Sequence, residues 1–321
     1  MAHQGSILDR LRRARRDRRA HRLVAADLPA RLEQVTQRWP EAKDEPLPCE
    51  DPVFIFSAGW RSGSTLLQRM VIAGSGFASD AGAGTSSGTG SGTGSGTMVW
   101  GEPHNRAEMI PNMARQWRPF TDRWPPFADQ DATLIEGPLQ DAWIPKLSPP
   151  VLALRRAHRA YFDTMFGAPA RELGYQRWGI KEVFLDPAHV VYLRWLFPAS
   201  RMLFLVRNPQ DAFLSYKTRG PWYLEWPERS IATGWSYGRL WSRLVTGYHA
   251  LSQEGLGLLV RYEDLETSSE RIAAHLGHHV PRPSELPRRR GDAPVRGTPR
   301  VGAFESLVIS ARTRSARRLL D

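Results

Sequence analysis

Residues with the types and spacing to do chemistry appear first in a short segment near position 60. Residues 52–65 read Pro-Val-Phe-Ile-Phe-Ser-Ala-Gly-Trp-Arg-Ser-Gly-Ser-Thr, an apolar run followed by a loop rich in glycine and serine. The apolar spacing after this loop predicts a helix over 65–72. A strand, a Gly/Ser loop and a helix start favour an anion, because unpaired N–H groups and the helix dipole point at it. We therefore predict a phosphate site.

The loop supplies both a cation and hydroxyl groups for this phosphate. The candidate binding residues are Arg61, Ser62, Gly63, Ser64 and Thr65. A nucleoside-triphosphate loop would have glycine where Ala58 stands and lysine where Ser64 stands. The usual lysine for a γ-phosphate is therefore missing, which favours a nucleotide whose reacting group is not a γ-phosphoryl group.

A second candidate phosphate site follows another apolar run. Residues 201–206 predict a buried strand that leads directly into Arg207, and Asn208 and Pro209 suit the start of a helix. Ser215 lies eight residues after Arg207, about two helical turns further on. A magnesium-dependent triphosphate enzyme commonly has an acidic residue at such a strand end, whereas this one is basic. An arginine and a hydroxyl at this spacing suit a second phosphate on the same nucleotide.

Together these motifs resemble those of the sulfotransferases that use 3′-phosphoadenosine 5′-phosphosulfate (PAPS). Residues 59–65 resemble the 5′-phosphosulfate loop, in the arginine form of tyrosylprotein and many bacterial members, and residues 207–216 resemble the 3′-phosphate motif. Three further segments resemble family elements in the same order, at 101–104, 178–182 and 260–265. The resemblance covers roughly residues 50 to 276. It implies PAPS as co-substrate, a hydroxyl-bearing acceptor and no metal.

The resemblance also implies roles for individual residues. Glu102 would be the general base that accepts the acceptor's proton, and His104 is a rival for that role. Arg61 and Lys181 would offset the charge that develops on the leaving phosphate. Arg207 and Ser215 would bind the 3′-phosphate, and Tyr262 would contact the nucleotide.

Plainer structural roles for these side chains remain open. Glu102 could cap a helix or be solvated, and Lys181 could form an ordinary salt bridge with Glu182 or Asp186. Tyr262 could pack without touching a nucleotide. Two other segments have suggestive compositions: the aromatic loop 222–226 could lie against an adenine or an acceptor, and 288–291 partly matches a loop that closes on the 3′-phosphate.

The elements that must position these residues alternate between strand and helix. Strands are predicted over 53–56, 98–100, 179–183, 201–206 and 257–261, with helices over 65–72, 187–197, from 209, over 228–253 as a pair, and over 263–276. Residues 106–177 are expected to be helical and irregular, as a wall of the acceptor pocket. This alternation predicts an α/β fold, a three-layer P-loop-type domain whose central parallel sheet is covered on both faces.

The chain divides into three predicted regions. Residues 1–50 form a basic N-terminal arm, helical over 5–40, and a linker, and 51–280 form the sulfotransferase domain. Inside that domain 81–97 is a Gly/Ser/Thr flexible tether, either a natural repeat expansion or a replacement for another loop. Residues 281–321 form a basic C-terminal tail that ends in a helix.

Composition limits the partners and the compartment. The 321 residues include 44 basic and 33 acidic side chains, a net charge of +11, which favours anionic partners. Cys49 is the only cysteine, so an intrachain disulfide and a zinc cluster are excluded. The sequence has neither an apolar run of about 18 residues nor an apolar stretch behind its basic start, so we expect a cytoplasmic protein.

The leading interpretation is therefore a PAPS-dependent sulfotransferase that acts on a hydroxyl. A P-loop kinase or nucleotide hydrolase is disfavoured by the missing lysine and by Arg207. A non-enzymatic binder of nucleic acid or other anions would explain only the basic arm and tail. We expect no nucleic-acid partner, although the arm could contact an anionic surface.

Overall fold

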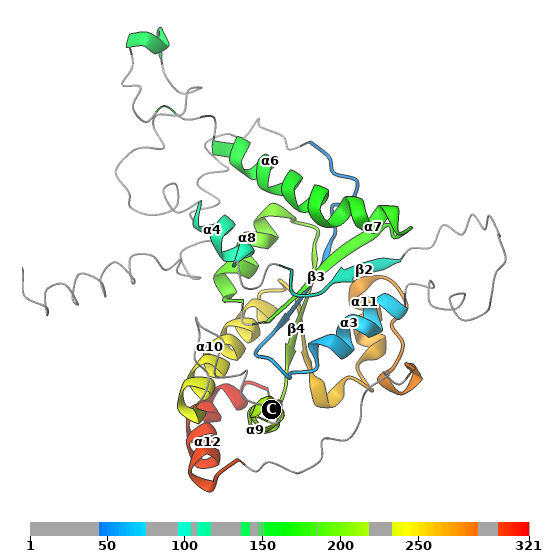
Figure 1. Ribbon diagram of the computed structural model, residues 1–321, viewed down its shortest axis with the longest axis vertical. Coiled ribbons are helices and arrows are strands. Elements are labelled where there is room, and N and C mark those ends of the chain that lie inside the picture. The colour runs from blue at the N-terminus through cyan, green and yellow to red at the C-terminus, as the bar shows by residue number, and fades with distance from the viewer. Residues whose placement is uncertain are drawn as a thin grey trace, which may run out of the picture.

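The centre of the fold is a five-stranded parallel sheet with the strand order β2-β3-β1-β4-β5 (Figure 1). Its strands are β1 (Val53–Ser57), β2 (Thr97–Trp100), β3 (Arg177–Val183), β4 (Arg201–Val206) and β5 (Leu258–Arg261). The computed structural model describes residues 45–74, 96–103, 108–116, 136–141, 147, 149, 151–183, 185–217, 233–287 and 301–320. The sheet confirms the α/β fold and all five strands that the sequence predicts. The N-terminal arm up to residue 44 lies outside the described residues.

The strands are apolar on both sides, as a sheet covered on both faces requires. In β1 the side chains alternate, so that Phe54 and Phe56 join one apolar cluster while Val53 and Ile55 join another. Neighbouring strands follow the same alternation, and the pairing of Phe56 with Phe204 brings their rings to a centroid separation of 5.9 Å. Register and face are thus fixed by burial on both sides.

Helices cover the two faces and complete three layers (Figure 1). They are α3 (Ser64–Ala73), α4 (Met109–Arg115), α6 (Val151–Phe162), α7 (Ala168–Glu172), α8 (Pro187–Leu196), α9 (Pro209–Lys217), α10 (Gly234–Gln253), α11 (Ser269–Leu276) and α12 (Ala303–Arg317). Buried side chains of α3 and α11 lie on one face, and those of α4, α8 and α10 on the other. Short turns are η4 (Leu139–Asp141), η8 (Tyr262–Asp264), η9 (Pro283–Glu285) and the π-helical η6 (Asp163–Gly167).

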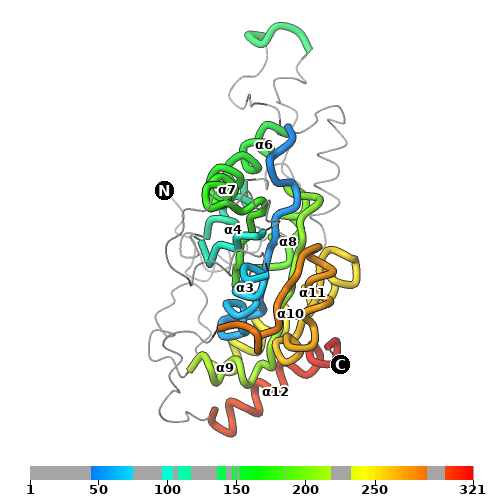
Figure 2. Tube along the Cα trace, turned by 90° about the vertical axis from the view of Figure 1, so that its right-hand side faces the viewer, coloured from blue at the N-terminus to red at the C-terminus, as the bar shows by residue number. Residues whose placement is uncertain are grey.

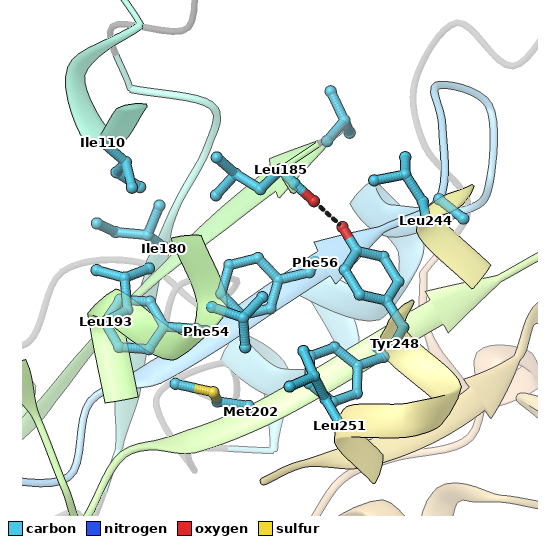
Figure 3. Packing of buried hydrophobic residues seen from close by; sticks show 14 of the residues in the cluster. Phe54, Phe56, Ile110, Ile180, Leu185, Leu193, Met202, Leu244, Tyr248 and Leu251 are labelled. Atoms are coloured by element: carbon cyan, nitrogen blue, oxygen red, sulfur yellow. Dashed lines mark hydrogen bonds between the residues drawn. The ribbon is translucent and has the colours of Figure 1, made fainter. Parts of the chain in front are cut away.

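Aromatic side chains fill the core on the α8 and α10 face (Figure 3). The ring of Tyr248 in α10 stacks on Phe204 at 5.1 Å, and its hydroxyl donates a hydrogen bond of 2.6 Å to the carbonyl oxygen of Leu185. This bond satisfies a buried polar group without opening the core to water. It also fixes the chain just beyond the end of β3, four residues after Lys181.

The last helix, α12, packs against α10 and reaches α9 (Figure 2). Gly238 permits this approach, since a Cβ there would lie 2.9 Å from the Cβ of Arg312. Two side-chain contacts join α12 to α9: Gln210 Nε2 donates to Ser310 Oγ at 2.6 Å, and Lys217 Nζ contacts Glu305 at 2.5 Å. The domain boundary at residue 280 stays a prediction, but α12 lies against the sheet domain.

Two helix predictions need correction. The segment predicted as one helix over 263–276 consists of the turn η8, a bend and then α11, which begins at Ser269. The expected helix pair over 228–253 is a single helix, α10, in its described part, and residues 218–232 lie outside the described chain. The side chain of Thr233 accepts a hydrogen bond from Ser236 N at 3.2 Å and so caps α10.

Candidate active site

The loop between β1 and α3 has a backbone that few residue types tolerate. Gly59, Arg61 and Gly63 all have positive φ, of 152°, 62° and 90°. Gly63 stands at the start of α3, and no side chain caps this first turn. The N-terminal N–H groups of a helix are anion donors when side chains leave them free. This geometry suits an anion, and phosphate binding by the loop stays a prediction.

The ring of Tyr262, the residue that follows β5, lies against this loop. A Cβ on Gly63 would lie 2.1 Å from Cδ2 of Tyr262. The guanidinium of Arg207 also lies over that ring, 4.4 Å from its centroid. Tyr262 thus packs against both the first loop and Arg207, the residue that follows β4. The sequence left open whether it contacts a nucleotide or simply packs, and a contact with the nucleotide stays a prediction.

The residues predicted to bind two separate phosphates contact each other directly. Arg61 Nε donates to Ser215 Oγ at 3.1 Å, and Arg207 Nη1 donates to the carbonyl oxygen of Arg61 at 2.8 Å. Trp241 Nε1 in turn donates to the carbonyl oxygen of Arg207 at 3.1 Å. The two predicted phosphate sites are therefore one connected cluster of cations and hydroxyls.

The serine and threonine side chains of the loop differ in exposure. Ser62 and Ser64 are buried, and Ser62 Oγ has no hydrogen-bond partner among the described residues. Thr65 is exposed at the start of α3. A buried hydroxyl without a protein partner is a candidate donor to a ligand. The roles of all three in binding stay predictions.

The start of α9 is already occupied by protein groups. Asn208 Oδ1 accepts from Gln210 N at 2.9 Å, and Glu263 Oε1 accepts from Asn208 N at 2.8 Å. A hollow of about 110 Å³ adjoins this helix start, lined by Arg207, Arg261, Glu263 and other residues. Because a carboxylate already caps α9, the start of α3 is the better of the two helix termini for an anion.

Glu102 and Lys181 form an ion pair at the same edge of the sheet. Lys181 lies two residues before the end of β3, and Glu102 follows the end of β2, so both lie at the carboxyl ends of neighbouring parallel strands. Lys181 Nζ contacts Glu102 Oε1, and the lysine side chain is only 6% exposed while that of the glutamate is 29% exposed. The partner of Lys181 is therefore Glu102, whereas Asp186 caps α8.

A second carboxyl group, which the sequence analysis considered only as a salt-bridge partner, lies beside this pair. Glu182 is buried, and burial together with the negative charge of Glu102 raises its pKa to about 8. Lys181 and a backbone hydrogen bond at Val183 act in the opposite direction. Glu182 lies in the strand predicted over 179–183, but its burial depends on neighbouring strands and helices, which the local sequence does not show.

Other predicted site segments lie outside the described residues: His104, most of the tether 81–97, the aromatic loop 222–226 and the segment 288–291. Within the described chain no group of three or more His, Cys, Asp or Glu side chains could hold a metal ion. In that same part of the chain no helix is long and apolar enough to cross a membrane.

The comparisons agree with the class of protein that the sheet and its loops indicate. A model described as "Sulfotransferase family" matches residues 52–283, and the chain belongs to this family. The matched region includes both predicted phosphate motifs and the Glu102–Lys181 pair. It ends before α12.

Comparisons with individual proteins add less. No curated protein matches the chain. Among solved structures, the sulfotransferase domain of the olefin synthase from Synechococcus PCC 7002 is similar, with 18% identity over 75% of this chain and 77% of that one, and a TM-score of 0.37.

Proposed function

We propose that this sulfotransferase moves a sulfuryl group from PAPS to a hydroxyl of an acceptor, with Glu102 as the general base. One observation supports this most directly: the Arg61–Ser215–Arg207 cluster and the Glu102–Lys181 pair both occupy the carboxyl ends of the parallel strands. Ligands of open parallel sheets bind at this edge. The site thus combines groups for phosphates with a carboxylate and a cation.

The loop before α3 would hold the 5′-phosphosulfate. Arg61 and the N–H groups at the start of α3 would offset the negative charge that grows on the phosphate as the sulfuryl group leaves. Arg207 and Ser215 would hold the 3′-phosphate. Since Arg61 and Ser215 are hydrogen-bonded to each other, binding of the nucleotide would exchange that bond for bonds to phosphate oxygens.

Glu102 would take the proton of the acceptor hydroxyl. Sulfuryl transfer forms a bond between the acceptor oxygen and sulfur and breaks the bond from sulfur to the phosphate oxygen, so the acceptor must lose a proton. A carboxylate at hydrogen-bonding distance from the hydroxyl can accept it. Lys181, now paired with Glu102, would help to neutralise the leaving phosphate.

The nucleotide preference tests the proposal. Adenosine 3′,5′-bisphosphate at about 100 times its Kd should add about 2.7 kcal/mol of stability and raise Tm by several degrees. ATP with magnesium should give a smaller shift, because the chain lacks a lysine for the γ-phosphate. Arg207→Ala should remove most of the preference for a 3′-phosphate, whereas Arg156→Ala, an exposed arginine of α6, should not.

Transfer itself is measured with sulfur-labelled PAPS and a panel of hydroxyl acceptors: carbohydrates, lipids, tyrosine peptides and phenols. Label in an acceptor supports the function and identifies the acceptor class. Equal thermal shifts with ATP–magnesium, or no shift with the bisphosphate, would contradict the proposed nucleotide.

A further inference from the structure

The most exposed large apolar side chains of the described chain lie close together. Phe304 and Leu307 of α12 are 77% and 67% exposed, and Trp235 in the first turn of α10 is 54% exposed. The two helices touch here, since a Cβ on Gly234 would lie 3.1 Å from the carbonyl oxygen of Glu305. Single apolar side chains are common on protein surfaces, but a group of large ones in one place marks an interaction surface.

The exposed side of α12 combines these apolar side chains with arginines. A stripe with spacings of three and four residues consists of Phe304, Leu307, Ala311, Arg314 and, directly after the helix, Arg318. Residues at this spacing lie on one side of a helix. All five are exposed, whereas the opposite side of α12 carries the buried side chains Ile309, Thr313 and Ala316. We call the five exposed residues and Trp235 the outer face of α12.

The charge of the outer face is entirely positive. The only acidic residue of α12, Glu305, is paired with Lys217. Within the described chain, the side chains of Arg314 and Arg318 take part in no hydrogen bond or ion pair. Arginines in a last turn also suit the helix dipole, which explains the basic end of α12 but not its exposed apolar residues. A partner that is both anionic and apolar satisfies the two halves of the outer face together.

We propose that the outer face of α12 binds an anionic lipid surface. Phe304 and Leu307 enter the headgroup region, and the arginines contact lipid phosphates. A helix that presents aromatic, leucine and arginine side chains together is of the kind that lies in the plane of a membrane interface. This binding is independent of the reaction at the other helices and needs no helix that crosses the membrane.

The shape of the outer face favours a membrane over an acidic protein. It is the convex side of a single helix, and α12 lies at one end of the fold in both views (Figures 1 and 2), where a planar surface can reach it. The ring of Trp235 is held there by Arg312, whose guanidinium carbon lies 3.0 Å from the ring centroid. Tryptophan is a residue type that membrane interfaces enrich.

A single label tests whether the outer face enters lipid. Cys49, the only native cysteine, is 5% exposed, so Leu307→Cys can be labelled selectively with an environment-sensitive dye. In the full-length protein its emission should shift to the blue with vesicles of phosphatidylcholine and phosphatidylglycerol, and not with phosphatidylcholine alone. The same dye on Leu173→Cys, beside α7 and 52% exposed, should not respond. A response that is equal at both positions, or absent at 307, would overturn the proposal.

Cosedimentation with the same vesicles measures the contribution of the apolar side chains. At about 0.3 M salt, purely electrostatic contacts are screened. The double variant Phe304→Ser, Leu307→Ser should bind at least about tenfold more weakly, because it loses two large apolar side chains. The matched double variant Met165→Ser, Leu173→Ser, on exposed apolar residues elsewhere, should bind as wild type does.

The arginines are tested at about 0.1 M salt, where screening is weaker. Arg318→Ser should weaken binding about fivefold, whereas Arg156→Ser, an exposed arginine of α6, should change it less than twofold. If the apolar double variant binds as wild type does, another basic segment carries the association and the proposal is wrong. A wild-type protein that does not bind the anionic vesicles would also overturn it and would favour an acidic protein as the partner. Neither result bears on nucleotide binding or on transfer.

Discussion

Glu102 and Lys181, which we propose as the general base and as a cation for the leaving phosphate, form an ion pair in the structure without any substrate. Lys181 is almost fully buried, and its ammonium group would be costly there without a carboxylate partner. The more exposed Glu102 is the member of the pair that an acceptor can reach. The ion pair therefore orders the side chain that we propose as the base.

Replacing Glu102 by glutamine separates its basicity from its shape. Glu102→Gln should reduce turnover by about 10²- to 10⁴-fold, because a positioned general base contributes that much, and it should leave the affinity for adenosine 3′,5′-bisphosphate unchanged. Labelled-sulfate transfer and calorimetry measure the two quantities. If His104→Ala abolishes turnover while Glu102→Gln stays nearly active, the base is the histidine.

Gly63 is required by two independent constraints, its backbone angle and its neighbour. Its φ is +90°, and a Cβ would lie 2.1 Å from the ring of Tyr262. Gly63→Ala should therefore destabilise the protein by more than the roughly 1–2 kcal/mol that a left-handed alanine costs alone, and it should weaken bisphosphate binding. Urea unfolding and titration calorimetry provide the measurements.

Gly277 offers the matched control for this substitution. It has a φ of +75° at the end of α11, but a Cβ there would meet no atom within 4 Å. Gly277→Ala should lower the free energy of unfolding only by the roughly 1–2 kcal/mol that a left-handed alanine costs, and it should leave bisphosphate binding intact. Equal losses of stability and affinity in the two variants would show that the contact between Gly63 and Tyr262 has no consequence.

The site residues could be predicted from the sequence where local pattern determines them. Arg61 follows a buried strand and Arg207 ends another, and parallel strands bring such residues to one edge. The hydrogen bond between Arg61 and Ser215 spans 154 positions and depends on packing that no local pattern contains. The burial of Glu182 was hidden for the same reason, since neighbouring strands and helices determine it.

At the scale of elements, strands were more predictable than helices. The strands are short and mainly apolar, with Lys181 and Glu182 in β3 as charged exceptions, and this signal depends on few neighbours. The predicted start of α11 was too early because Glu263 and Asp264 belong to the turn η8, whose Tyr262 packs against the loop between β1 and α3. Tertiary contact there prevailed over local helix propensity.

The helix α12 is an element whose contribution can be measured directly. Ile309 is fully buried among core residues, while Leu307 on the same helix is 67% exposed. Ile309→Ala should lower the free energy of unfolding by about 2–5 kcal/mol, since it leaves a cavity. Leu307→Ala should change it by no more than about 0.5 kcal/mol. Similar small effects of both, measured by urea unfolding, would mean that α12 does not stabilise the domain.

At the scale of the whole molecule, one buried histidine links stability to pH. His158 in α6 is 5% exposed, and its ring lies between Tyr192 of α8 and Gln116 at the end of α4. The distances are 2.6 Å from Nδ1 to the tyrosine hydroxyl and 3.2 Å from Nε2 to the amide oxygen. Three helices on one face of the sheet thus meet at an imidazole, whose pKa burial lowers to about 4.

The direction of this pH dependence follows from the pKa of His158 in the folded and in the unfolded protein. The unfolded histidine binds a proton below about pH 6.5, whereas the folded one stays neutral down to about pH 4, so stability is lost as pH falls through this range. The loss from this group approaches roughly 3 kcal/mol at pH 4. His158→Gln cannot take up a proton, so its free energy of unfolding should fall less than that of wild type between pH 7 and pH 4.5. Urea unfolding at several pH values measures both slopes, and parallel curves for the two proteins would mean that His158 does not couple folding to pH.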